Sequence, residues 1–65
     1  MKRACLYNEE EGVYVLGVAE DAWKIIYNFL QKHNYTIYHV REWEEDGRHW
    51  YDVGSHSEFF FTEEI

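Results

Sequence analysis

The dipeptide Asp46-Gly47 constrains the fold of this 65-residue chain more than any other feature of its sequence. It separates two segments, residues 35–43 and 48–53, that are rich in aromatic and β-branched residues. Asp-Gly is a preferred type I′ turn of two residues, because both of its positions must take positive φ. Such a turn also fixes the register of the hairpin that it closes. We therefore predict a β-hairpin from these two segments.

The register of this hairpin follows by counting outward from the turn. The expected pairs are Glu45 with Arg48, Glu44 with His49, Trp43 with Trp50, Glu42 with Tyr51, Arg41 with Asp52 and Val40 with Val53. Most pairs join opposite charges or two apolar side chains, and a slip of one residue would destroy this sorting. The core face is then expected to hold Tyr38, Val40, Tyr51 and Val53. The outer face is expected to hold Arg41, Trp43, Glu45, Arg48, Trp50 and Asp52.

A second hairpin and one helix are predicted before residue 35. Residues 3–7 and 13–18 have strand composition, and Gly12 suits positive φ at the end of the loop between them. Either face of this hairpin can be the buried one. Residues 20–33 predict a helix whose apolar stripe is formed by Ile26, Phe29, Leu30 and His33.

The ends of the predicted helix carry capping signals. Glu20 and Asp21 are expected in its first turn and Lys32 near its last turn, as the helix dipole prefers. Glu20 and Lys24 have the spacing of a favourable ion pair. Asn34 suits a left-handed residue that ends the helix.

The C-terminal residues 55–65 fit two structures. Phe59, Phe60 and Phe61 favour a strand, whereas Ser55 and Glu58 match a helix capping box. We favour the strand, paired with either hairpin. The predicted fold is therefore α+β with two layers and a single domain over residues 1–65. An antiparallel sheet of four or five strands, in the order ββαββ with or without a C-terminal strand, carries one helix on one face.

One helix cannot cover both faces of such a sheet. Ile37, Trp43 and Trp50 are expected on the uncovered side. An exposed aromatic face of this kind is usually occupied by a partner or by a second copy of the chain.

Composition narrows the classes of partner. Thirteen acidic and six basic residues give a net charge of −7, which disfavours direct binding to nucleic acid or to anionic membranes. The same charge favours a basic protein partner. No apolar run approaches the roughly 18–20 residues of a membrane span, and no signal-peptide core follows Met1. Together with the single cysteine, which fits a reducing compartment, these features predict a cytoplasmic protein.

No residue pattern indicates catalysis, a cofactor or a metal. The four histidines, His33, His39, His49 and His56, lack the spacing of metal ligands. Cys5 is interpreted as a small buried residue and Ser55-His56-Ser57 as a polar loop. We expect no enzyme activity, and a minimal metal-binding domain is the weakest of the alternatives.

The sequence thus predicts a small acidic protein-interaction module. Its expected partner-binding residues are Ile37, Arg41, Trp43, Glu44, Glu45, Asp46, Trp50 and Asp52. Acidic clusters at residues 9–11, 42–46 and 58–64 could mimic the phosphates of a nucleic acid and inhibit a basic nucleic-acid-binding protein. Small inhibitors encoded by phages or mobile elements have this size and composition. The alternative is a structural module that forms a homodimer through its open sheet face.

Overall fold

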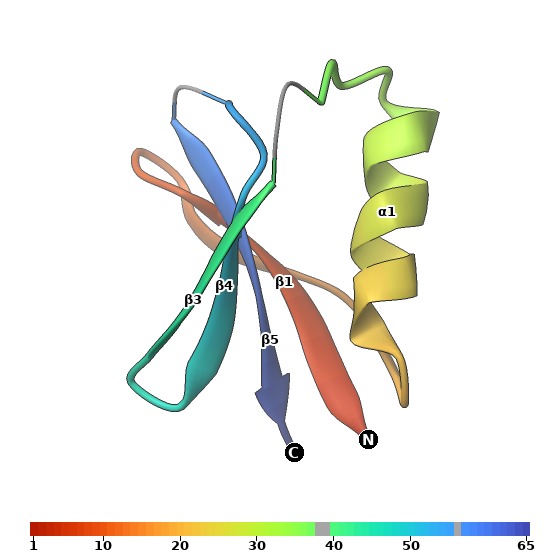
Figure 1. Ribbon diagram of the computed structural model, residues 1–65, viewed down its shortest axis with the longest axis vertical. Helices are drawn as coiled ribbons and strands as arrows, with labels where there is room; N and C mark the ends of the chain where they lie inside the picture. The colour runs from red at the N-terminus through yellow and green to blue at the C-terminus, as the bar shows by residue number, and fades with distance from the viewer. Residues whose placement is uncertain (38–39, 56) are drawn as a thin grey trace.

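The computed structural model describes residues 1–37, 40–55 and 57–65. Its elements are β1 (Lys2–Asn8), β2 (Gly12–Ala19), α1 (Ala22–Lys32), β3 (Arg41–Glu45), β4 (Arg48–Asp52) and β5 (Glu58–Glu64). The strands form one antiparallel sheet in the order β2-β1-β5-β4-β3, and α1 packs on one of its faces (Figure 1). The predicted two-layer α+β fold is confirmed, including its fifth strand.

The C-terminal strand β5 is the centre of the sheet. It pairs with β1 on one side and with β4 on the other, so it joins the two hairpins that the sequence predicted separately. Successive residues of a strand point to opposite faces. Phe60 and Phe61 are both completely buried, which shows that both faces of the sheet are covered at this strand.

The hairpin of β3 and β4 has the predicted turn and register. Asp46 and Gly47 have φ values of 54° and 75°, as a type I′ turn requires. All five pairs from Arg41–Asp52 to Glu45–Arg48 are formed as predicted. The sixth predicted pair lies outside the ladder, because β3 begins only at Arg41; Val53 is buried but Val40 is exposed. Tyr38 lies outside the described residues.

Helix α1 is shorter than predicted at its N-terminus. Asp21 is the N-cap residue, without a side-chain cap hydrogen bond, so Glu20 and Asp21 precede the first turn rather than forming part of it. Asn34 ends the helix with a φ of 56°, as predicted. The Asn34 and Tyr35 backbone N–H groups donate to the carbonyls of Gln31 and Leu30, which is the Schellman arrangement.

The main core lies between α1 and the sheet. It is formed by Ala4, Leu6, Ala22, Ile26, Leu30, Val53 and Phe60. Ala4 and Leu6 therefore mark the face of β1 that lies under the helix. Gly17 of β2 lets α1 approach closely, since a Cβ atom there would lie 3.2 Å from Cδ1 of Ile25.

Ile37 was expected on the uncovered face of the sheet, and that prediction is wrong. Ile37 is half-buried and packs against the helix-side core. The cause lies in the turn after α1, which sends the chain back over the core and places the Tyr35 ring 6.2 Å from that of Phe60. The Tyr35 hydroxyl donates to Glu58 at 2.7 Å, and burial together with this bond raises the pKa of Tyr35 to about 12.

Candidate partner-binding surface

The face of the sheet opposite α1 is here called the outer face. Phe60 lies under the helix, so Phe61 and its direct neighbours across the strands, Cys5 and Trp50, belong to the outer face. The predicted outer-face residues of β3 and β4 follow from the same alternation. They are Arg41, Trp43, Glu45, Arg48, Trp50 and Asp52.

The helix leaves the outer face uncovered, as expected for Trp43 and Trp50, but aromatic side chains of the sheet cover one another at its centre. The Trp43 and Trp50 rings stack with centroids 6.2 Å apart and planes 9° from parallel. Tyr7 meets the Trp50 ring edge-on at 5.8 Å. Phe61 lies 4.8 Å from Trp50 and is completely buried, and Cys5 beside it is 1% exposed. The aromatic side chains of the sheet cover each other, and burial raises the pKa of the Cys5 thiol.

An open depression remains beside the stacked indoles, and we call it the aromatic hollow. Its volume is about 320 Å³, and it is lined by Tyr7, Trp43, Glu45, Arg48, Trp50 and Phe59. The Phe59 ring meets that of Trp43 edge-on at 6.1 Å. Both indole rings are half-buried, so they are held in place and still reach solvent. Such held aromatic rings are typical anchors of protein interfaces.

The two indole N–H groups differ in their surroundings. Trp43 Nε1 donates to Glu45 Oε1 at 3.1 Å. Trp50 Nε1 is buried and has no acceptor among the described residues. A buried donor without an acceptor usually costs about 1–3 kcal/mol. The lining of the hollow is mainly aromatic, and its charged groups are the carboxylate of Glu45 and the guanidinium of Arg48.

Charges on the outer face are balanced. Its strand residues carry three arginines and three carboxylates, which are Arg3, Arg41, Arg48, Glu45, Asp52 and Glu63. Arg41 pairs with Asp52 at 3.0 Å, and Glu63 accepts from Arg3 at 3.2 Å and from Arg48 at 3.3 Å. Arg48 also lies over the Phe61 ring at 4.4 Å. The net charge of −7 therefore comes from the rest of the molecule.

Three predicted partner-binding residues do not lie on the outer face. Glu44 is on the helix-side face, where it and Glu42 hold the His49 ring at 2.5 and 2.7 Å. These two hydrogen bonds, the one to Glu44 first, raise the pKa of His49. Asp46 is exposed in the turn, and Ile37 packs against the core. The structure does bring together Arg41, Trp43, Glu45, Trp50 and Asp52.

Three residues of the aromatic hollow, Tyr7, Arg48 and Phe59, were not among the predicted partner-binding residues, although Arg48 was expected on the outer face and Phe59 was considered as an apolar anchor. Tyr7 and Phe59 face each other across β1 and β5. The strand propensity of residues 59–61 was recognised, but their place between the hairpins was not. The usable signal was the run of three phenylalanines, which predicts a strand buried on both faces and hence a central one.

Within residues 1–37, 40–55 and 57–65, no three His, Cys, Asp or Glu side chains are grouped to bind a metal ion. His39 and His56 lie outside these residues. Among the helices of the same residues, none has the length and hydropathy needed to cross a membrane. Compared with protein-family models, curated proteins and solved structures, the chain matches none.

Proposed function

We propose that this chain is a small acidic interaction module that binds a basic protein through its outer face. The observation that carries the proposal is the stacked pair of Trp43 and Trp50, half-buried beside an open apolar hollow. An aromatic or aliphatic side chain of the partner would fill the hollow. Burial in such a preformed depression needs little reordering of the chain, which favours affinity.

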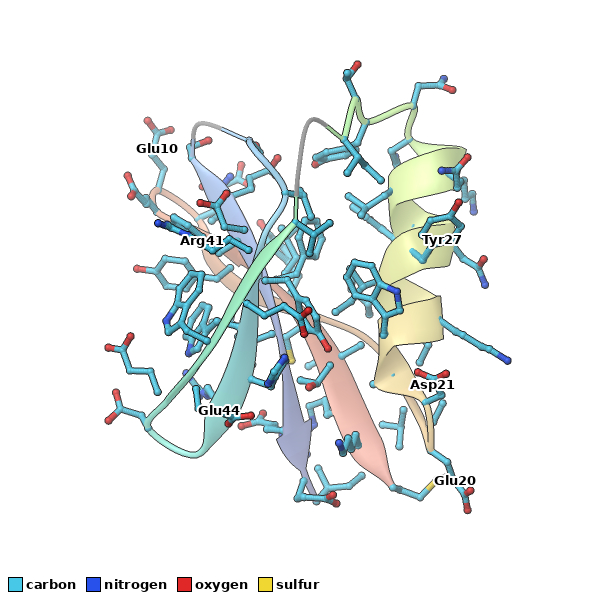
Figure 2. The ribbon with its side chains drawn as sticks, in the orientation of Figure 1. Glu10, Glu20, Asp21, Tyr27, Arg41 and Glu44 are labelled. Carbon is cyan, nitrogen blue, oxygen red and sulfur yellow. The ribbon has the colours of Figure 1, made fainter. Side chains whose placement is uncertain are left out.

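The distribution of charge suits the outer face for direct contact with the partner and the rest of the surface for long-range attraction. The outer face carries as many positive as negative side chains, and Glu45, the carboxylate beside the indoles, accepts from Trp43 Nε1. The remaining surface carries the excess of carboxylates, including exposed Glu10 and Glu44 (Figure 2). A net charge of −7 accelerates the encounter with a positively charged protein over distances near the Debye length.

A nucleic-acid-binding protein is the partner class that we place first. Its basic groove would be attracted by the acidic clusters at residues 9–11, 42–46 and 58–64, and occupation of that groove would inhibit it. In this role the chain contacts no nucleic acid itself. The proposal includes no catalytic step, cofactor or metal.

A second copy of the chain is the alternative occupant of the outer face. It is favoured by one observation, the charge balance of this face, because two such faces can pack together without repulsion. Exposed Val13, Val15 and Val18 would extend the same contact, since their partners on β1, which are Tyr7, Cys5 and Arg3, belong to the outer face.

Affinity capture with the full chain as bait tests the proposal. A partner should be retained from an extract of the source cells at low salt and should be released at high salt, where charges are screened. Trp43→Ala should weaken binding of that purified partner at least about thirtyfold, the effect of an interface hot spot. The matched control is Tyr27→Ala, which removes an exposed aromatic ring from the helix instead.

The results of these measurements separate the proposal from its alternative. If no protein is retained at low salt, the proposal is overturned. It is also overturned if Trp43→Ala and Tyr27→Ala bind the partner equally well. Light scattering at micromolar concentration gives the alternative: a dimer that dissociates on Trp43→Ala assigns the outer face to a second copy.

A further inference from the structure

The sheet has two free edges, and β2 is the unprotected one. None of its eight residues, Gly12–Ala19, is charged, and none is proline. Val13, Tyr14, Val15 and Val18 are 50%, 47%, 62% and 43% exposed. An edge strand turns unpaired N–H and C=O groups outward, and proteins usually guard such an edge with charges or proline. The edge of β2 therefore offers a template for one more strand.

A bulge in the pairing of β2 with β1 limits the length of β2 that can accept another strand. The register between β1 and β2 shifts after Ala4, so that Leu16 has no partner in β1. Residues 12–15 form a regular stretch before this bulge. A bulge increases the local twist of an edge and shortens the length over which another strand can pair. Pairing with an added strand is therefore expected first along residues 12–15.

Carboxylates lie at both ends of this edge. Residues 9–11 precede β2, and Glu20 and Asp21 follow it. Figure 2 shows Glu10 and Glu20 at opposite ends of the molecule. The first cluster is held in a defined loop, because Asn8 Oδ1 accepts the backbone N–H groups of Glu10 and Glu11 at 2.9 and 3.0 Å.

This charge arrangement selects the occupant of the edge. Pairing of two copies confined to residues 12–15 would join only four residues of each copy. Two copies paired antiparallel about a twofold axis along the whole of β2 would bring residues 9–11 of one copy to Glu20 and Asp21 of the other. Like charges brought together in this way disfavour the pairing. A strand with Lys or Arg at both ends and apolar residues in its centre meets attraction instead. The attraction is strongest at residues 9–11, because Lys2 of β1 lies opposite Ala19 and offsets part of the charge of Glu20 and Asp21.

We propose that the edge of β2 binds an extended, basic-ended segment of a partner as a sixth strand of the sheet. Backbone hydrogen bonds supply the affinity in this mode of recognition, and alternate side chains supply the specificity. Every second side chain of the added strand lies beside Val13 and Val15 on the outer face. This inference concerns a different surface from the aromatic hollow and does not depend on it.

A synthetic peptide tests the inference with the full chain. The probe has two lysines, six alternating valine and threonine residues, and two lysines. We expect it to shift the backbone amide resonances of β2 and to slow hydrogen exchange there, with little change at Trp43. The same peptide with glutamates at its ends should bind at least about tenfold more weakly, because like charges then meet at both ends.

Two matched pairs of variants locate the contact. Val15→Lys places a charge on the β2 edge and should weaken peptide binding at least about tenfold, whereas Val40→Lys, at another exposed valine, should not. Glu9→Gln with Glu10→Gln should also weaken binding. The control is Glu45→Gln with Asp46→Asn, which also removes two negative charges but does so at the β3 edge of the sheet. Asn suits the turn as Asp does, and this variant should leave peptide binding unchanged.

Three results would overturn the inference. They are the absence of peptide binding, binding that Val15→Lys leaves intact, and resonance shifts centred on the aromatic hollow. A concentration-dependent dimer with protected β2 amides would assign the edge to a second copy and reject the basic-ended partner. Trp43→Ala should leave peptide binding unchanged, so failure of this inference is distinguishable from failure of the proposed function.

Discussion

Phe60 and Phe61 are neighbours in β5, and both are completely buried, yet they stabilise opposite faces of the sheet. Phe60 packs beneath α1 with aliphatic side chains and with the Phe29 and Tyr35 rings. Phe61 is covered by Trp50 and by the guanidinium of Arg48. One residue is enclosed by a second layer of the fold, and the other only by side chains of the sheet itself.

This difference separates the tasks of the two faces. A helix seals the helix-side core, so its packing contributes to stability and offers no surface to a partner. The outer face has no second layer in the described chain (Figure 1). Its rings bury each other only in part, and the apolar area that remains exposed at the aromatic hollow can still be removed from water by binding.

The largest expected effect is at Phe60. Phe60→Ala would leave a cavity that α1 and the sheet cannot close, and it should cost about 4–5 kcal/mol of unfolding free energy. A domain of this size has a stability of roughly 3–10 kcal/mol, so the loss is about half of that stability or more, and the variant unfolds at 25 °C if the native chain lies in the lower half of this range. Urea denaturation followed by circular dichroism measures the loss.

A milder substitution keeps this prediction measurable if the alanine variant does not fold. Phe60→Leu should retain the fold and cost about 1–2 kcal/mol. If both Phe60 variants are as stable as the native chain, the helix-side core does not dominate stability, and the comparison of the two faces fails.

Phe61→Ala should cost less, about 2–3 kcal/mol. The outer face is open beside this residue, so Trp50 and Arg48 can move into the space and water can enter it, which reduces the cavity cost. The same movement should disturb the stacking of Trp43 on Trp50. Near-ultraviolet circular dichroism of the tryptophans should therefore change more in Phe61→Ala than in Phe60→Leu. A loss equal to that of Phe60→Ala would show that the outer face is as rigidly enclosed as the core.

Local patterns in the sequence were sufficient to predict the second hairpin. The requirement of Asp46-Gly47 for positive φ set the turn, and counting outward set all five pairs of the observed ladder. Asn34 predicted the end of α1 for the same reason, because its left-handed conformation was recognisable from residue type. These features depend on interactions within a few residues of the chain.

Long-range placement was beyond the same reasoning. No local pattern near residues 58–64 indicates that this strand pairs with β1 as well as with β4. Tyr7 and Phe59 could therefore not be assigned to the site, although each was visible as an aromatic residue in a strand. Ile37 was misplaced because strand alternation was extended into residues 35–37, where the chain folds over the core instead.

The smallest expected effect is a pH dependence at His49, on the helix-side face at β4. The hydrogen bonds that the protonated ring donates to Glu44, and then to Glu42, raise the pKa of His49 in the folded state above the ordinary value of 6.5. Protonated His49 therefore stabilises the fold fully below about pH 6.5, and this contribution is lost as pH rises through the folded-state pKa. The free energy of unfolding should fall as pH rises above about 6.5, by less than about 1 kcal/mol because solvent screens these pairs.

Comparison of the native chain with His49→Gln separates the contribution of His49 from that of the other histidines. Chemical denaturation of the native chain and of His49→Gln, measured across the same pH range, should give a difference that shrinks as pH rises. His33→Gln is the matched control, since it replaces an exposed histidine at the C-terminus of α1, away from Glu42 and Glu44. A pH-independent difference for His49→Gln would mean that the two carboxylates do not hold a charged imidazole, and that this part of the helix-side face is stabilised by packing on Tyr51 alone, whose ring lies 4.8 Å away.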